Sequence, residues 1–134
     1  MKNIQALQAE KAKQPQLVLE TKHYWVDGMY CRELFRPAGT LIVGKVHKKE
    51  HFYMVIKGAV RVSDGEVHID YFAPTILVCS PGTKRAVYAL EDSVCITVHR
   101  TEFNELEAIE NDLVEDDPDS MYLPGNIVKE GLLT

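Results

Sequence analysis

The chain has 134 residues, a mass of 15.2 kDa and 46% hydrophobic residues, which is enough for one domain with a buried core. It has no run of about 18 apolar residues, and its N-terminal segment has no apolar stretch such as a secretory signal needs. These features exclude a membrane-spanning helix and predict a soluble cytoplasmic protein that is not exported. The cysteines, Cys31, Cys79 and Cys95, stand singly and are odd in number, which favours reduced thiols.

The net charge of −5 at neutral pH is unevenly distributed. Residues 101–120 contain nine Asp or Glu residues and no Lys or Arg, so the rest of the chain is weakly basic. Such a segment is either a solvated tail, or it forms a subunit contact or covers a basic patch. Two features argue against a nucleic-acid partner: the basic residues are not interleaved with exposed aromatic ones, and this segment is acidic.

The predicted elements begin with a short helix over residues 4–13, which ends before Pro15. Residues 17–100 are rich in Val, Ile, Tyr, Phe and Thr in short runs separated by turn signals, which predicts an all-β domain of two packed sheets or a barrel. The expected strands are 23–26, 29–35, 40–46, 51–58, 59–63, 66–72, 75–80, 85–90 and 93–100. Strand 51–58 is apolar on both faces, so it is expected at the centre of a sheet.

A second helix is expected over residues 101–113, whose apolar residues fall on one side. Residues 114–134 are interrupted by Pro118, Pro124, Gly125 and Gly131, which predicts an extended arm. The expected organisation is therefore an N-terminal helix or arm (1–16), a β-barrel (17–100), and an acidic helix with a C-terminal arm (101–134).

Two histidines, His47 and His51, lie four residues apart in the stretch GKVHKKEHFYMVIKG, at the start of an expected strand. Imidazoles at such a position either bind a metal ion or pack with satisfied hydrogen bonds. The other three histidines, His23, His68 and His99, are interpreted as packing or surface residues.

The segments PAGTLIVGKVHKKEHFYMVIKGAVRV and VCSPGTKRAVYALEDSVCITVH resemble the two consecutive motifs of the cupin superfamily. Gly39, Gly58, Pro81 and Gly82 fall at or next to the framework positions of those motifs. The resemblance covers residues 39–99 and implies a double-stranded β-helix, a jelly-roll barrel with an internal pocket. The second segment is also similar to cupin-like proteins of tailed bacteriophages.

The resemblance places Lys45, His47, His51 and Arg85 at the four usual metal-ligand positions of cupins. Lysine and arginine are cationic at neutral pH, do not ligate metal ions in that state, and oppose a nearby divalent cation. A metal site would then consist of His47 and His51 with water, and Glu50 would join only if the strand bulged. No cofactor is the first expectation, with a divalent metal ion as the alternative.

The period of two along a strand predicts which side chains face the barrel interior. If Lys45 and His47 point inward, the inward set on neighbouring strands is His51, Tyr53, Val55 and Lys57, together with Arg85 and Val87. Ammonium, guanidinium, imidazole and phenol groups form a donor-rich lining that suits an anion. The alternative is that Lys45 and Arg85 extend to solvent at the strand ends.

Three functions follow as hypotheses. The first is a non-enzymatic cupin that binds a small anionic ligand, nucleotide-like or a sugar phosphate, through Lys45, His47, His51, Tyr53 and Arg85, such as a phage-encoded sequestering protein in the host cytoplasm. The second is a metal-dependent cupin enzyme, an isomerase or dioxygenase-like protein, that uses His47 and His51. The third is a structural or assembly protein, a phage virion or accessory component, whose barrel is a scaffold. Self-association into a dimer or higher homo-oligomer is expected, since the apolar arm needs a surface to pack on.

Overall fold

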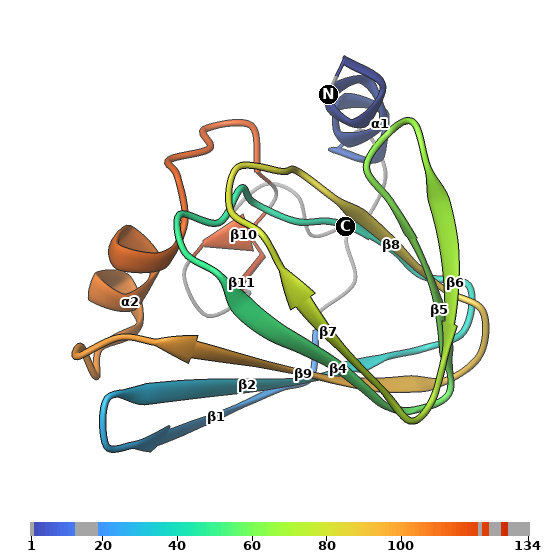
Figure 1. The fold of residues 1–134 in the computed structure, drawn as a ribbon. Coiled ribbons are helices and arrows are strands. Elements are labelled where there is room, and N and C mark those ends of the chain that lie inside the picture. Colours follow the sequence, from blue (N-terminus) through green and yellow to red (C-terminus); the bar gives the residue numbers. More distant parts are fainter. Residues whose placement is uncertain (1, 13–18, 121, 124–126, 129–134) are drawn as a thin grey trace.

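A computed structural model of the chain describes residues 2–12, 19–120, 122–123 and 127–128. Within these ranges two antiparallel sheets face each other around one core (Figure 1). The first sheet has five strands in the order β1-β2-β9-β4-β7, namely β1 (Thr21–Val26), β2 (Met29–Arg36), β9 (Ser93–Arg100), β4 (His51–Lys57) and β7 (Thr75–Cys79). The second has four strands in the order β3-β8-β5-β6, namely β3 (Leu41–Val43), β8 (Ala86–Ala89), β5 (Ala59–Ser63) and β6 (His68–Phe72). The predicted all-β jelly-roll barrel is confirmed.

The core lies between the two sheets and is built from alternate residues of their strands. Val55 of β4 and Val60 of β5 are fully buried, and Val87 and Cys95 pack with them. A valine side chain that is removed from water stabilises the fold by about 1.5 to 3 kcal/mol, so these few contacts hold the sheets together.

Strand β4 is central, as predicted, because it pairs with β7 on one side and β9 on the other. His51, Tyr53 and Val55 are buried on its inner face. The prediction that Lys57 shares this face is wrong: the pairing with β9 shifts register between Val55 and Lys57, and Lys57 is exposed. The outer face of β4 is apolar but is not covered within the described part of the chain.

The turn from β4 to β5 explains why a glycine occupies position 58. Gly58 has a φ of +82°, which favours glycine, and a β-carbon there would overlap the carbonyl oxygen of Asp92 and the hydroxyl of Ser93. The Ser93 hydroxyl in turn accepts a hydrogen bond from the Ala59 N–H at 3.1 Å. The glycine therefore allows this turn to pack directly on the start of β9.

The strand expected over residues 40–46 is shorter in the structure and ends at Val43. The backbone beyond it bonds to the second helix and its end instead of to a strand: the Lys48 N–H donates to the Leu113 carbonyl at 2.7 Å, and the Glu115 N–H donates to the Val46 carbonyl at 2.8 Å. Lys45 consequently lies on a loop, which corrects its predicted place on a strand, and His47 lies on the same loop.

The two helices are α1 (Lys2–Ala12) and α2 (Leu106–Leu113). Helix α2 begins five residues later than expected, because the chain after β9 first makes a turn in which the Phe103 N–H donates to the Thr101 hydroxyl at 3.3 Å. It lies at the end of the barrel where β4 starts and β9 finishes (Figure 1), and its buried residues Ile109 and Leu113 pack on Tyr30. Neither described helix has the length and apolar character needed to cross a bilayer.

The C-terminal segment contains a short antiparallel pair, β10 (Tyr122–Leu123) and β11 (Ile127–Val128). The remaining apolar residues of the expected arm, Met121, Leu132 and Leu133, lie outside the described residues. The division of the chain at residues 16 and 100 stays a prediction.

Candidate metal centre and ligand cavity

The barrel encloses a cavity of about 320 Å³, which lies in the size range of small-molecule sites. Much of its wall is apolar, with Leu34, Ile42, Val62, Leu77 and Val87 among the lining residues. Four cationic side chains and one carboxylate also line it, namely Arg32, Arg36, Lys45, Arg85 and Glu110. The described wall of the cavity therefore has an excess of positive charge.

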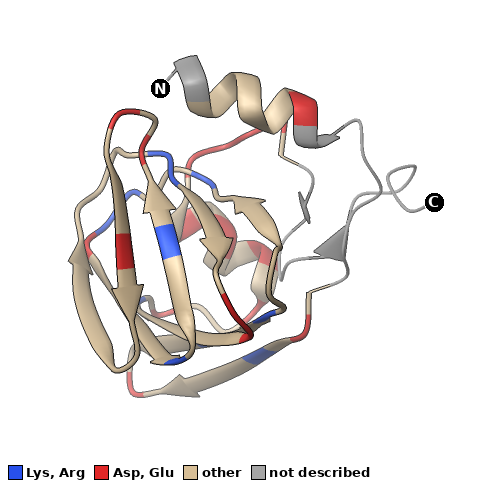
Figure 2. Cartoon of the chain, turned by 90° about the vertical axis from the view of Figure 1, so that its right-hand side faces the viewer, with Lys and Arg blue, Asp and Glu red and all other residues tan. Residues whose placement is uncertain are grey.

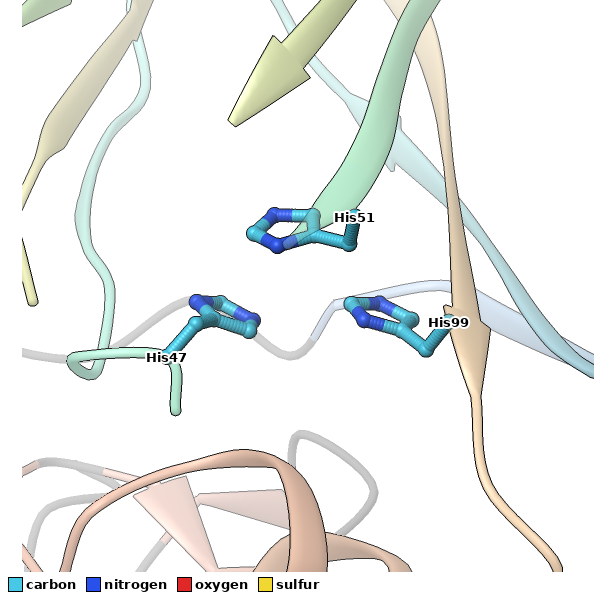
Figure 3. A group of neighbouring side chains, drawn as sticks. All are labelled: His47, His51 and His99. Atoms are coloured by element: carbon cyan, nitrogen blue, oxygen red, sulfur yellow. The ribbon is translucent and has the colours of Figure 1, made fainter. Parts of the chain in front are cut away.

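Three histidines, His47, His51 and His99, converge on this cavity (Figure 3). One potential ligand atom from each ring lies within 4.8 Å of the others. The ring centroids are 4.1 Å apart for His47 and His51, 4.8 Å for His51 and His99, and 5.4 Å for His47 and His99. The predicted pair of imidazoles is thus part of a group of three, which we call the histidine triad.

The antiparallel register of two central strands brings His51 and His99 together. Tyr53 of β4 lies opposite Thr97 of β9, so two residues further along the same face His51 meets His99. His47 reaches them from the loop after β3, where a backbone bridge to Val114 holds it. His99 is buried and hydrogen-bonded, as expected of a packing residue, and this geometry also makes it a member of the histidine triad. Its inward direction follows from the period of β9, but its partner depends on strand pairing, which the sequence does not reveal.

Contacts of the outer nitrogens orient two of these rings. His51 Nδ1 lies 3.3 Å from the Lys49 carbonyl oxygen, and His99 Nε2 lies 2.8 Å from the Thr97 hydroxyl. If each of these nitrogens carries the proton, the other nitrogen of each ring keeps a free lone pair. The fully buried ring of Tyr30 stacks on His99 at 5.9 Å and further restricts its rotation. Such supporting contacts are typical of histidines that ligate metal ions.

Burial keeps the triad neutral. It lowers the pKa of His47 to about 3, with smaller contributions from His51, Arg32 and Arg85, and lowers the pKa of His99 to about 2, with contributions from its two neighbours. Burial also lowers the pKa of His51. Neutral imidazole is the form that binds metal ions, so all three side chains are in the ligating state at neutral pH.

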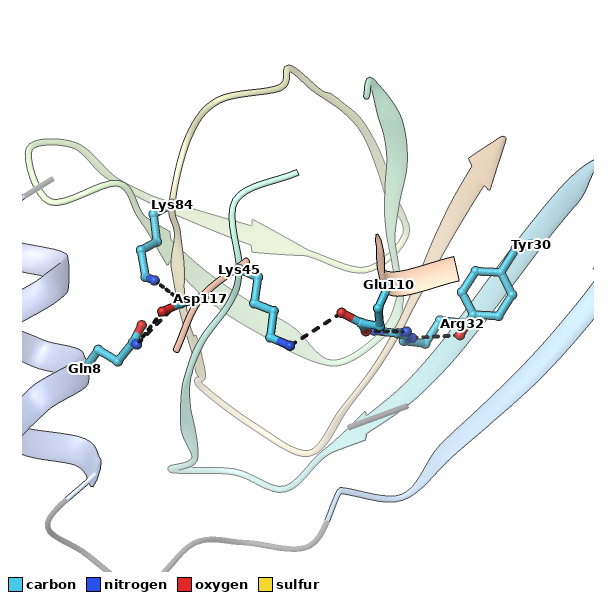
Figure 4. Close-up of polar contacts among 7 residues, drawn as sticks. All are labelled: Gln8, Tyr30, Arg32, Lys45, Lys84, Glu110 and Asp117. Atoms are coloured by element: carbon cyan, nitrogen blue, oxygen red, sulfur yellow. Dashed lines mark hydrogen bonds and ion pairs between the residues drawn. The ribbon is translucent and has the colours of Figure 1, made fainter. Parts of the chain in front are cut away.

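A carboxylate from helix α2 balances the cations beside the triad (Figure 4). Glu110 accepts hydrogen bonds from Arg32 at 3.1 Å and from Lys45 at 3.5 Å, and its side chain is 9% exposed. Arg32 also donates through Nε to the Tyr30 hydroxyl at 2.9 Å. The network joins β2, the loop after β3 and α2, so it fixes the helix over the barrel end.

Two further acidic residues of the segment 101–120 bind basic residues of the barrel. Asp112 pairs with Lys49 at 2.8 Å, and Asp117 pairs with the buried Lys84 while Gln8 of α1 also donates to it. Figure 4 shows the contacts of Asp117, and Figure 2 colours the acidic and basic residues of the chain. This arrangement agrees with the interpretation of the acidic segment as a cover for a basic patch.

The remaining predicted site residues are placed as follows. Lys45, Tyr53 and Arg85 all line the cavity, so the interior placement is favoured over side chains that extend to solvent. Arg85 is half-buried and forms no ion pair with a carboxylate of the described residues. Glu50 and His68 are exposed and are not members of the triad. The residues that sequence reasoning missed are His99, Arg32, Arg36 and Glu110.

Comparison with solved structures shows which known fold the chain has. A cupin superfamily protein from Desulfitobacterium hafniense matches with a TM-score of 0.55 at 10% identity, over 66% of this chain and 81% of the other. KdgF from Halomonas sp. matches with a TM-score of 0.57 at 15% identity, over 66% and 84%. An acetylacetone dioxygenase from Acinetobacter johnsonii matches with a TM-score of 0.53 at 16% identity, over 61% of this chain and 59% of its own. No protein-family model matches the sequence, and no curated protein matches it significantly.

The chain therefore has the cupin fold, as its motifs predicted. At these identities the similarity concerns the fold alone. The similarity to bacteriophage proteins stays a prediction.

The neutral triad predicts that acid destabilises the metal-free protein. Unfolded histidine titrates near 6.5, whereas folded His47 and His99 titrate at about 3 and 2, so between these values the unfolded chain binds more protons. Stability is complete above pH 6.5 and falls below it, by up to about 1.4 kcal/mol per pH unit for each histidine, or about 2 kcal/mol each at pH 5. Urea unfolding with a chelator at pH 7.5 and 5 measures this.

The test variant is His99→Gln, and its matched control is His68→Gln. The first should remove about one histidine's share of the pH dependence, and the second, at an exposed position, should leave it unchanged. Equal stability at the two pH values, or equal effects of the two variants, would contradict the neutral triad.

Proposed function

We propose that this cupin barrel binds a divalent transition-metal ion through His47, His51 and His99 and holds a small anionic molecule beside it. The observation that supports the metal site is the convergence of three imidazoles on one cavity, two of them buried and the third, His47, half-buried. This favours the second sequence hypothesis, a metal-dependent cupin, and extends its ligand set from two histidines to three.

The donor set fits such an ion. Neutral imidazole suits zinc, copper, iron and nickel, and a set of three protein ligands leaves coordination positions open, as in catalytic zinc sites. When bound, the ion would supply a Lewis acid that polarises an oxygen of the bound molecule. The chain's own part is to orient the imidazoles through Lys49, Thr97 and Tyr30.

Charge balance supports the same site. The sequence argument against a metal ion was that Lys45 and Arg85 would repel it. Glu110 contacts Lys45 and Arg32 together, so these two cations are partly neutralised by a carboxylate that the motifs did not indicate. Arg85, the other cation at the usual ligand positions, forms no ion pair with a carboxylate of the described residues.

An enzymatic role is compatible with the fold. One protein with this fold is named as an acetylacetone dioxygenase, and three-ligand metal sites with open positions are typical of catalytic centres. We therefore extend the proposal to metal-dependent chemistry on the bound molecule, with His47, His51 and His99 as ligands.

Metal analysis of protein purified without a histidine tag tests the site. After exposure to zinc or nickel and removal of the excess, the wild type should retain about one equivalent. His99→Ala should weaken the affinity by at least about tenfold to a hundredfold, the loss typical even of outer-shell changes. His68→Ala, at an exposed histidine outside the triad, is the matched control. Less than about a tenth of an equivalent in the wild type would leave the metal site without support.

A separate observation, the cationic excess of the cavity wall, supports the proposal of an anionic ligand. Lys45 and Arg85 line the cavity together with His47, His51 and Tyr53, which agrees with the first sequence hypothesis. An ion held by neutral histidines would keep its double positive charge and add to the attraction for an anion. The narrower proposals, a nucleotide-like or sugar-phosphate ligand and its sequestration by a phage-encoded protein in the host cytoplasm, rest on the resemblance alone.

Substitutions of Arg85 test whether the cavity binds such an anionic ligand. Calorimetry against a panel of nucleotides and sugar phosphates should show binding that Arg85→Ala weakens by about 2 to 4 kcal/mol, a loss of roughly thirtyfold to a thousandfold. Arg85→Lys should recover only part, because the planar fork is lost. Arg61→Ala, an exposed arginine paired with Asp70, serves as the control. Normal binding by Arg85→Ala would exclude Arg85 from the ligand site.

Self-association is proposed through the outer face of the five-stranded sheet, which fits a second copy of the chain. The register places two uncharged rows across it, Val78, Phe52 and Val98 in one row and Ile76, Met54 and Ile96 in the next. Ile76 and Val78 are 67% and 63% exposed. A contiguous apolar patch of this kind is rare on monomers. The two rows are uncharged across β7, β4 and β9, and the second row ends on β2 and β1 in Glu33 and Lys22, which pair with each other.

Light scattering tests this face. The wild type should have the mass of a dimer or larger assembly at micromolar concentration, and Val78→Lys should shift it towards the monomer, because the interface would bury an unpaired charge. Val67→Lys makes the same change at an exposed valine beside the other sheet and should not. A monomeric wild type, or equal masses for all three proteins, would contradict the assignment.

A further inference from the structure

Arg36, the last residue of β2, places a guanidinium inside the barrel without a counter-charge. The residue is 8% exposed and lines the cavity. Its Nε and Nη1 atoms have no hydrogen-bond partner among the described residues, and none of the carboxylates described there forms an ion pair with it. A buried cation is costly unless it is paired, so the environment of Arg36 is incomplete.

A second unpartnered polar group lies beside it. The Tyr53 hydroxyl is also buried and makes no hydrogen bond of good geometry in the described structure, although it and the Cys95 thiol lie near enough to Arg36 to interact with it. Burial raises the pKa of Tyr53, so the hydroxyl keeps its proton and can donate it. A neutral hydroxyl and a thiol do not neutralise a guanidinium. The Nε and Nη1 groups of Arg36 and the hydroxyl of Tyr53 are therefore donors without an acceptor, and one ligand acceptor group could satisfy them.

The strand register relates these donors to the histidine triad. On the inner face of the five-stranded sheet, His51, His99 and Tyr30 form one row, and Tyr53, Thr97 and Arg32 form the next. The two rows are about 7 Å apart, because each residue of a strand advances by about 3.3 Å. Arg36 belongs to a row further along, beyond Leu34, and its side chain extends back to Tyr53 and Cys95.

We infer that the cavity binds a small organic acid whose carboxylate is held by Arg36 and Tyr53 and whose other end reaches the histidine triad. A carboxylate offers a guanidinium two oxygen acceptors in matching geometry and supplies the missing negative charge. The wall between the two ends is apolar at Leu34, Leu77 and Val87, which fits a hydrocarbon body. The inference rests on the proposed function for its second anchor and adds the chemical class of the ligand.

Glutarate, which has a carboxylate at each end of a three-carbon chain, is the probe, and pentane-1,5-diol is its uncharged counterpart. Calorimetry on the full chain loaded with zinc should detect glutarate and not the diol. Arg36→Gln should weaken glutarate binding by about tenfold to a hundredfold, which corresponds to the loss of a hydrogen bond to a charged group. Arg36→Lys should restore part of it, and Arg61→Gln, the same change on an exposed arginine, should have no effect.

A measurement on the wild type covers the case in which Arg36→Gln does not fold. The ¹⁵N resonance of Arg36 Nε, assigned by its loss in Arg36→Lys, should move when glutarate is added and stay when the diol is added. Unchanged glutarate affinity in Arg36→Gln, or an Arg36 resonance that glutarate does not move, overturns the inference.

The two proposals fail in different ways. A protein that retains zinc but does not bind glutarate would overturn the carboxylate site while the metal site stands. A chelator-treated protein that binds glutarate at Arg36 but retains no zinc would support the carboxylate site and overturn the metal site.

Discussion

The rest of the site depends on the ion pairs that Glu110 forms with Arg32 and Lys45. The Glu110 carboxylate binds both from one position on α2, so it attaches the helix to the barrel and balances two cations beside the triad. Removal of such a buried partner leaves uncompensated charge and typically costs about 3 to 5 kcal/mol. Without it, the histidines would face unbalanced positive charge in a more open cavity.

The burial of the triad has a chemical consequence for the histidines. In water each imidazole would be partly protonated near pH 6.5, and three protonated rings within a few ångströms would repel one another. Burial favours the neutral form, and the same burial excludes competing water from the lone pairs. The triad is therefore suited to a cation, while Arg36 and Arg85 elsewhere on the wall are suited to anionic groups. We therefore propose that one cavity combines sites for both kinds of charge.

The fold was largely predictable because its signals are local. Short β-rich runs, turn residues and the glycines at 39 and 58 specify a barrel, and the period of two placed Tyr53 and His51 on the inner face. The pattern failed where tertiary contacts override it: the helix α2 takes the backbone bonds that would have extended β3, and a register shift turns Lys57 outward.

The site was less predictable because it depends on pairings between distant segments. The motif gave His47 and His51 but not His99, whose partnership with His51 requires the β4 and β9 register. Glu110 belonged to an acidic segment with no motif, and its contact with Arg32 spans 78 residues of sequence. Arg36 was hidden for another reason: a lone arginine at a strand end is ordinarily expected to reach solvent, and here it is buried.

X-ray absorption at the metal edge of the zinc-loaded wild type tests the central claim most directly, because it reports the ligands themselves. The account predicts three imidazole nitrogens at about 2.0 to 2.1 Å, with the characteristic scattering of the outer ring atoms, and lighter oxygen donors in the remaining positions. A shell made of oxygen alone, or one with fewer than two imidazoles, would contradict the assignment of His47, His51 and His99 as a metal centre.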